Sequence, residues 1–102
     1  MNANLIQSDL IEYRSANLAY DELYAKIGTN ESLARLMRSE RSAVTRRRRE
    51  AAENLAMCMV GHYSPKLAAA GLLDFYKSIS AGAESDTVTF RVAEETVKFL
   101  SA

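Results

Sequence analysis

The sequence predicts an all-α protein that folds as one compact bundle of four or five helices over residues 1–102. A chain of 102 residues suits a single domain with one modest core. Its 4 glycines and 1 proline are few, which disfavours a turn-rich all-β chain and a disordered linker. Hydrophobic residues make up 48% of the chain, an ordinary share for a globular protein.

A first helix is expected over about 5 to 27, because apolar residues recur there at alternating steps of three and four and so form one stripe. Asn17 interrupts this stripe, whose members are Ile6, Leu10, Tyr13, Tyr20, Tyr24 and Ile27. Gly28 supplies a left-handed stop. Thr29 or Asn30 can then cap the next helix, with Glu31 in its first turn.

The segment from 31 to 62 contains no proline, and its first glycine is Gly61. It can therefore form one helix of roughly 50 Å at about 1.5 Å per residue. The alternative is two helices, 31 to 38 and 40 to 62, with a break near Ser39.

Ser64 and Pro65 form a good helix start, since serine can cap and proline at the first position loses no needed donor. A helix over 65 to 80 is expected, with Gly82 just past its end. Its buried face would consist of Leu67, Leu72, Phe75, Tyr76 and Ile79.

The C-terminal segment fits two patterns. Residues 87–92, TVTFRV, alternate like a strand. A helical stripe also runs through Val88, Val92, Thr96 and Leu100. A helix over 87 to 101, capped by Ser85 or Asp86, is favoured because a lone strand would leave its backbone groups unpaired.

Charge is unevenly distributed although the formal net charge is zero. Residues 1 to 31 and 84 to 102 are acidic, whereas residues 35 to 49 hold a single acid, Glu40, among seven arginines. These arginines are Arg35, Arg38, Arg41, Arg46, Arg47, Arg48 and Arg49. The zero net charge argues against indiscriminate coating of nucleic acid, so the basic middle is the feature to explain.

Four adjacent arginines on a helix point in four directions, because successive residues turn by about 100°. The apolar stripe of this helix would place Arg47 or Arg48 at a core position, so this part of the helix is expected to lie beyond the core. Three interpretations remain open. The arginines are solvated or paired with Asp9, Glu12, Asp21 or Glu22, or they bind phosphate, or they dock on an acidic protein.

Residues 32 to 50, SLARLMRSERSAVTRRRRE, resemble the helix-turn-helix segment of bacterial repressors and activators. The packed positions of that family's first helix are matched by Leu33, Ala34 and Met37. Ser39 to Arg41 match the turn and the entry to the second helix, and Val44 matches its inward position. Arg38 stands where the family usually has glycine, and arginine favours an uninterrupted helix.

In that family the second helix enters the DNA major groove, and dimers commonly read paired half-sites. The resemblance implies a small DNA-binding regulatory protein, a homodimer, whose arginine cluster contacts phosphates. Glu40 would lie by position near the groove, and the binding residues would be Arg38, Arg41, Ser42, Thr45, Arg46, Arg47, Arg48 and Arg49. The alternative is a small helical protein of phage or mobile-element type that binds or inhibits another protein through its charged patches.

Other chemistry is not expected. Cys58 and His62 share a helix face at metal-ligand spacing, but two ligands do not close a site, and a lone cysteine on an apolar stretch is usually core packing. The sequence shows no catalytic constellation and no phosphate-binding glycine loop, so we expect neither an enzyme nor a cofactor nor a small-molecule substrate. The opening MNANLIQSDL lacks signal-peptide features, and no apolar run could span a bilayer, which favours a cytoplasmic protein without membrane contact.

Overall fold

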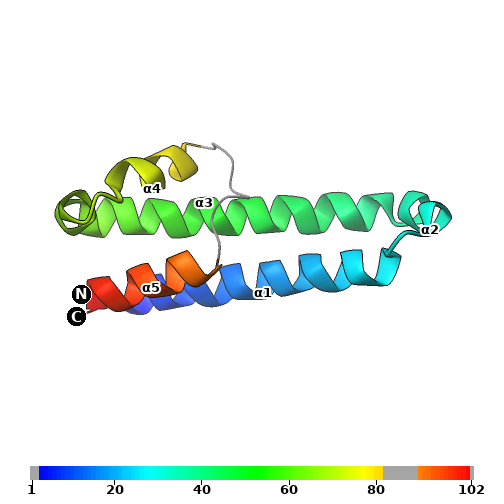
Figure 1. Cartoon of the computed structure of the whole chain (residues 1–102), viewed down its shortest axis with the longest axis horizontal. Helices are drawn as coiled ribbons and strands as arrows, with labels where there is room; N and C mark the ends of the chain where they lie inside the picture. Colours follow the sequence, from blue (N-terminus) through cyan, green and yellow to red (C-terminus); the bar gives the residue numbers. More distant parts are fainter. Residues whose placement is uncertain (1–2, 82–89, 102) are drawn as a thin grey trace.

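The computed structural model describes residues 3–81 and 90–101, which form five α-helices and no strand. These are α1 (Ala3–Ile27), α2 (Glu31–Leu36), α3 (Arg38–Ala69), α4 (Leu73–Ser80) and α5 (Phe90–Ser101). The predicted all-α bundle is confirmed. Helices α1 and α3 run antiparallel along the length of the molecule, which measures 49 × 22 × 17 Å (Figure 1).

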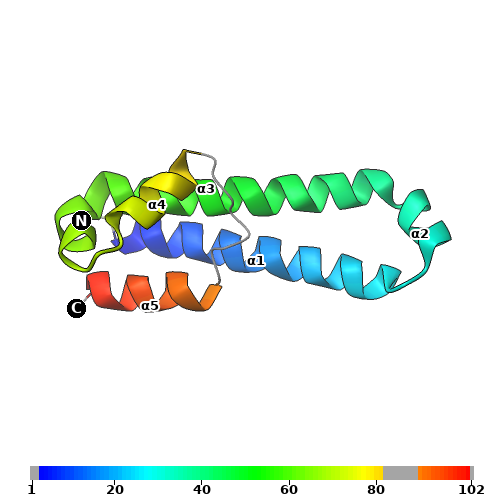
Figure 2. The same ribbon diagram turned by 45° about the horizontal axis from the view of Figure 1, so that its top comes forward.

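The two long helices carry different neighbours at their two ends. Helix α4 packs on α3 and α5 packs on α1, both at the end where the chain termini lie, while α2 caps the opposite end (Figures 1 and 2). We call the end that contains α4, α5 and the chain termini the core end. We call residues 17–50 the arginine arm; they comprise the last part of α1, the short α2 and the start of α3.

The hydrophobic core lies almost entirely in the core end. It consists of Ile6, Leu10, Tyr13, Ala16, Ala51, Ala52, Leu55, Ala56, Met59, Leu67, Tyr76, Ile79, Val97 and Leu100. Four of these residues are alanines, whose small side chains let α1 and α3 approach closely. The buried Tyr76 hydroxyl donates a hydrogen bond to Thr96 Oγ1 at 2.9 Å and so links α4 to α5. In the arginine arm, by contrast, Ile27 is the one buried residue.

The boundary between α1 and α2 forms as the sequence predicts. Gly28 has a φ of 54°, a left-handed conformation that glycine adopts without steric cost, and its N–H donates to the Tyr24 carbonyl. Asn30 is the N-cap of α2, and its side chain accepts a hydrogen bond from the Leu33 N–H at 3.0 Å.

The break between α2 and α3 lies at Met37 and not near Ser39. Met37 has φ −100° and ψ 27°, and Arg38 is already helical. The bend removes the Ala34 carbonyl from the regular helical ladder, and Arg41 Nε donates to this oxygen at 2.9 Å. The two-helix alternative is therefore correct, but the predicted ranges 31 to 38 and 40 to 62 are shifted. The connection is a single residue, without a left-handed conformation at Arg38.

The prediction of one helix over 65 to 80 is wrong. The backbone departs from helical geometry at Tyr63, two residues before Pro65, and helix then resumes to Ala69. Gly71, with φ 74°, ends it, and the N–H groups of Gly71 and Leu72 donate to the carbonyls of Ala68 and Leu67. This is the Schellman arrangement that glycine favours, and α4 begins only afterwards.

The apolar face predicted for 65 to 80 is partly correct. Leu67, Tyr76 and Ile79 are buried, whereas Leu72 and Phe75 are half-buried against the core. In α5, Thr96 and Leu100 are buried as the helical stripe predicts. Residues 82–89 lie outside the described residues, and with them the proposed stop at Gly82, the Ser85 or Asp86 cap, and Val88. Phe90–Ser101 is helical, so the strand alternative for 87–92 is wrong from Phe90 onward.

Candidate functional site

The arginine cluster lies on the first part of α3, beside the last part of α1. No residue of α3 before Ala51 is buried, which confirms that this stretch lies beyond the core. At about 100° per residue, Arg47 points opposite to Arg38, whereas Arg49 returns to the Arg38 side. The four adjacent arginines divide into Arg47 and Arg48, which contact side chains of α1, and Arg46 and Arg49, which line a cavity.

Arg47 contacts α1 through an ion pair. Its Nε and Nη2 donate to the two carboxylate oxygens of Glu12, both at 3.0 Å, and Nη2 also donates to Ser15 Oγ at 3.0 Å. This two-point geometry matches the planar guanidinium to the carboxylate. The hydrogen bond from Arg47 lowers the pKa of Glu12. Arg47 thus helps hold α3 against α1 at the edge of the hydrophobic core.

Arg48 also contacts α1, but through an aromatic ring. Its guanidinium carbon lies 3.6 Å from the centre of the Tyr20 ring, a cation–π contact. The Tyr20 ring in turn packs against Tyr24, with centroids 4.5 Å apart and an angle of 33° between the rings. In this part of the helix pair, arginine and tyrosine side chains make the contacts that leucine side chains would make in a hydrophobic core.

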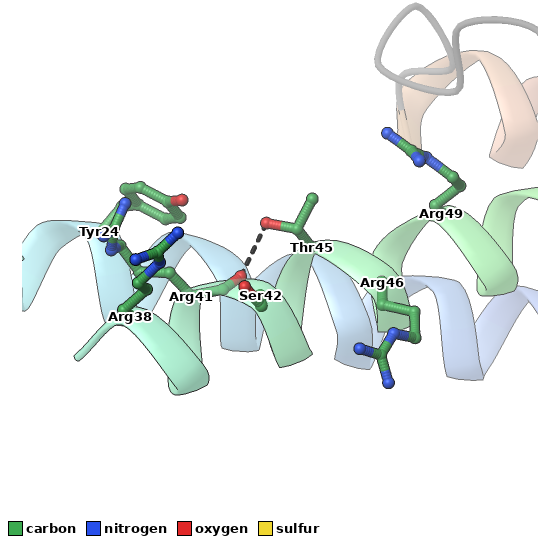
Figure 3. A pocket seen from close by; sticks show the side chains of 7 residues that line it. All are labelled: Tyr24, Arg38, Arg41, Ser42, Thr45, Arg46 and Arg49. Atoms are coloured by element: carbon green, nitrogen blue, oxygen red, sulfur yellow. Dashed lines mark hydrogen bonds between the residues drawn. The ribbon is translucent and has the colours of Figure 1, made fainter.

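Four further arginines surround an open cavity of about 390 Å³ that Tyr24 of α1 also lines (Figure 3). We call it the arginine cavity, and its lining residues are Tyr24, Arg38, Arg41, Ser42, Thr45, Arg46 and Arg49. The lining contains four guanidinium groups and three hydroxyls but no carboxylate. In the view of Figure 3, Thr45 and Arg49 project from one side of α3 and Arg46 from the other. The cavity is therefore cationic and rich in hydrogen-bond donors.

Two of the lining side chains are already held by the backbone. Arg41 Nε donates to the Ala34 carbonyl, and Thr45 Oγ1 donates to the Arg41 carbonyl at 2.8 Å. The Arg41 guanidinium is thus fixed in direction at the edge of the cavity. Within the described residues, Arg38, Arg46 and Arg49 are paired with no carboxylate.

The structure brings together six of the eight predicted binding residues, namely Arg38, Arg41, Ser42, Thr45, Arg46 and Arg49. Arg47 and Arg48 face α1 instead. Sequence reasoning assigned Tyr24 to an apolar stripe and so missed that it lines the cavity. The sequence contained a signal for this role of Tyr24. In an antiparallel helix pair, Tyr20 and Tyr24 lie opposite the arginine-rich start of the next long helix and not opposite apolar residues.

Intramolecular pairing explains only part of the arginine cluster. Of the acids that could oppose it, Glu12 pairs with Arg47. Asp9 instead lies beside the Cys58 thiol, and burial raises the pKa of both groups. Asp21 and Glu22 are exposed, and no ion pair joins them to an arginine in the described part of the chain.

The Cys58 and His62 pair shows no sign of a metal site or a nucleophile. Cys58 is half-buried against the core, whereas His62 is exposed. In residues 3–81 and 90–101, no group of three histidine, cysteine or acidic side chains is placed to hold a metal ion. The raised pKa of Cys58, caused first by burial and then by the Asp9 charge, keeps its thiol protonated near neutral pH.

Similarity to known proteins does not indicate a function for this chain. No protein-family model, no curated protein and no solved structure matches the chain. None of the helices in the described residues combines the length and apolar character needed to cross a membrane.

Proposed function

We propose that the protein is a small DNA-binding regulatory protein that contacts the phosphate backbone through the arginine cavity. The observation that carries this proposal is the cavity lining, four guanidinium groups with no carboxylate among them. Guanidinium groups match phosphate oxygens in shape and charge, and they release condensed counterions when they bind nucleic acid.

The arrangement favours phosphates over base edges as the main contacts. Arg41 and Thr45, which the helix-turn-helix resemblance would turn toward bases, have hydrogen bonds to the backbone of their own chain. Arg38, Arg46 and Arg49 have no carboxylate partner among the described residues and can reach outward. In this proposal α3 has the position of the recognition helix, and phosphate contacts supply most of the affinity.

The test measures how duplex DNA binding depends on salt. For the parent protein, log Kd should rise with log salt concentration by about 0.9 for each phosphate neutralised. Replacing Arg46→Ala and Arg49→Ala together should weaken binding at low salt and reduce this slope by about 1.8. Fluorescence anisotropy with mixed-sequence duplexes measures both quantities.

The matched control removes the same charge from the core end. Lys77→Ala with Lys98→Ala changes two exposed lysines on α4 and α5, and it should leave the salt slope unchanged. Circular dichroism of each variant verifies that the helices remain folded. If the parent protein binds no DNA at low salt, or if its binding is insensitive to salt, the DNA proposal is wrong.

The second candidate is docking on an acidic protein. Leu36 favours it, because this side chain is 80% exposed at the end of α2 and follows the exposed Arg35. An apolar anchor beside a cation suits a protein partner better than DNA. Capture of a partner that survives nuclease treatment and is lost with Leu36→Asp would support this candidate. The homodimer implied by the resemblance stays a prediction, which sedimentation velocity tests.

A further inference from the structure

Tyr24 is the one aromatic side chain in the lining of the arginine cavity. It is 36% exposed, so a substantial part of its surface is in contact with solvent. Phosphate binding alone does not call for an aromatic ring at this place. The ring and the guanidinium groups around it are therefore expected to contact the same ligand.

Contacts behind Tyr24 support its position. Tyr20 packs against it at 4.5 Å, and the guanidinium of Arg48 covers Tyr20 at 3.6 Å. Both tyrosines lie on α1 one helical turn apart, whereas Arg48 belongs to α3. The stack thus joins the two helices, and Tyr24 is the member of it that reaches the cavity.

The cations that accompany Tyr24 are spread along the first part of α3. From Arg38 to Arg49, α3 rises about 17 Å, with about 12 Å between Arg38 and Arg46 and about 4.5 Å between Arg46 and Arg49. A flexible single strand can adjust its phosphates to cations at such unequal intervals, whereas the phosphates of a duplex keep a fixed arrangement.

We propose that the arginine cavity binds single-stranded DNA, with an unpaired base stacked on Tyr24 and the flanking phosphates on Arg38, Arg46 and Arg49. A cationic groove that follows the backbone, combined with an aromatic surface for bases, is how proteins bind single strands without sequence preference. In a duplex the faces of the bases are covered by their neighbours, so the ring of Tyr24 would have no base to contact. This inference rests on the proposed DNA binding and specifies which form of DNA the site prefers.

The experiment separates the base contact from the phosphate contacts. It compares three probes by fluorescence anisotropy: an oligothymidine strand of about twelve nucleotides, within the range that such sites cover, an abasic strand with the same number of phosphates, and a duplex of equal length. The parent protein should bind oligothymidine more tightly than the other two. Stacking of one base should favour it over the abasic strand about tenfold.

Variants at Tyr24 identify the side chain responsible. Tyr24→Leu should abolish the preference for oligothymidine over the abasic strand, because leucine has no aromatic face. Tyr24→Phe should retain this preference, since the ring remains and only the hydroxyl is lost. The two variants differ in the ring alone, so a general loss of fold would not produce this pattern.

Each outcome has a separate meaning. Equal binding of oligothymidine and abasic strand by the parent, or a preference that persists in Tyr24→Leu, would overturn the inference. Salt-dependent binding that Arg46→Ala with Arg49→Ala weakens would in that case still support the proposed function. Failure of every probe to bind at low salt would reject the proposed function and the inference together.

Discussion

The core end and the arginine arm are built from the same two helices but are held together by different interactions. In the core end, α1 and α3 bury leucines, tyrosines and closely packed alanines, and α4 and α5 cover them. In the arginine arm the same two helices are joined by Arg48 over Tyr20, and at its boundary with the core end by the Arg47–Glu12 ion pair. Ile27 is the one described side chain buried there.

This difference indicates that the core end supplies most of the stability, whereas the arm carries the proposed binding surface. Burial of apolar surface stabilises the core end, and surface ion pairs contribute little by comparison. The arm can therefore keep a row of like charges exposed because its helices are continuous with a stably packed region. A cationic surface with no role in the core is free to change its contacts when a ligand binds.

The largest expected effect contrasts a leucine in each region. Leu55→Ala in the core end, where the side chain is 1% exposed, should lower the free energy of unfolding by about 2–5 kcal/mol. Leu18→Ala in the arm, where the side chain is 58% exposed, should change it by no more than about 0.5 kcal/mol. Urea unfolding followed by circular dichroism measures both. Similar losses for the two variants would show that the arm has a core of its own.

A smaller effect is expected at the two left-handed glycines, one in each region. Gly28→Ala and Gly71→Ala should each reduce stability by about 1 kcal/mol, because an alanine Cβ is strained at positive φ. Neither Cβ would clash, since its nearest atom at Gly28 is the Ala25 carbonyl oxygen at 3.9 Å and nothing lies within 4 Å at Gly71. The same urea titrations apply. If only Gly71→Ala is destabilising, the tip of the arm opens independently of the core end.

The smallest effect concerns the ion pair of the arm. Arg47 holds the pKa of Glu12 below its usual value. Because the folded-state pKa is the lower one, the pair contributes stability above the pKa of Glu12 in the unfolded chain. This contribution is lost as the pH falls through the folded-state value. The side chains are 42% and 49% exposed, so solvent weakens the pair and the stability change is expected to be slight.

Carbon-detected NMR titration of Glu12 measures this effect directly. In Arg47→Ala the pKa of Glu12 should rise toward its usual value, and the chemical shifts of α4, which packs on α3 away from this pair, should stay unchanged. A pKa that is equally low in parent and variant would mean that another group stabilises the carboxylate. The arm would then be held together by contacts other than this pair.

Several features were predictable because they depend on local chemistry. Glycine at position 28 and asparagine at position 30 determine how α1 ends and α2 begins, and both act through their own backbone or side chain. The burial of Tyr13, Leu67 and Ile79 follows from helical periodicity. The break at Met37 was not predictable in the same way, because no glycine, proline or capping side chain marks it, and the Arg41 contact with the Ala34 carbonyl appears only in the structure.

The order of amino acids by itself determined the helical class, the position of the basic segment and the divergence of its four adjacent arginines. Only the tertiary structure decided that Arg47 and Arg48 face α1, whereas Arg46 and Arg49 line a cavity with Tyr24. The physical reason is the placement of α1. A helix fixes the directions of its own side chains relative to one another. The helix packed beside it determines which of those side chains face a carboxylate, a ring or water.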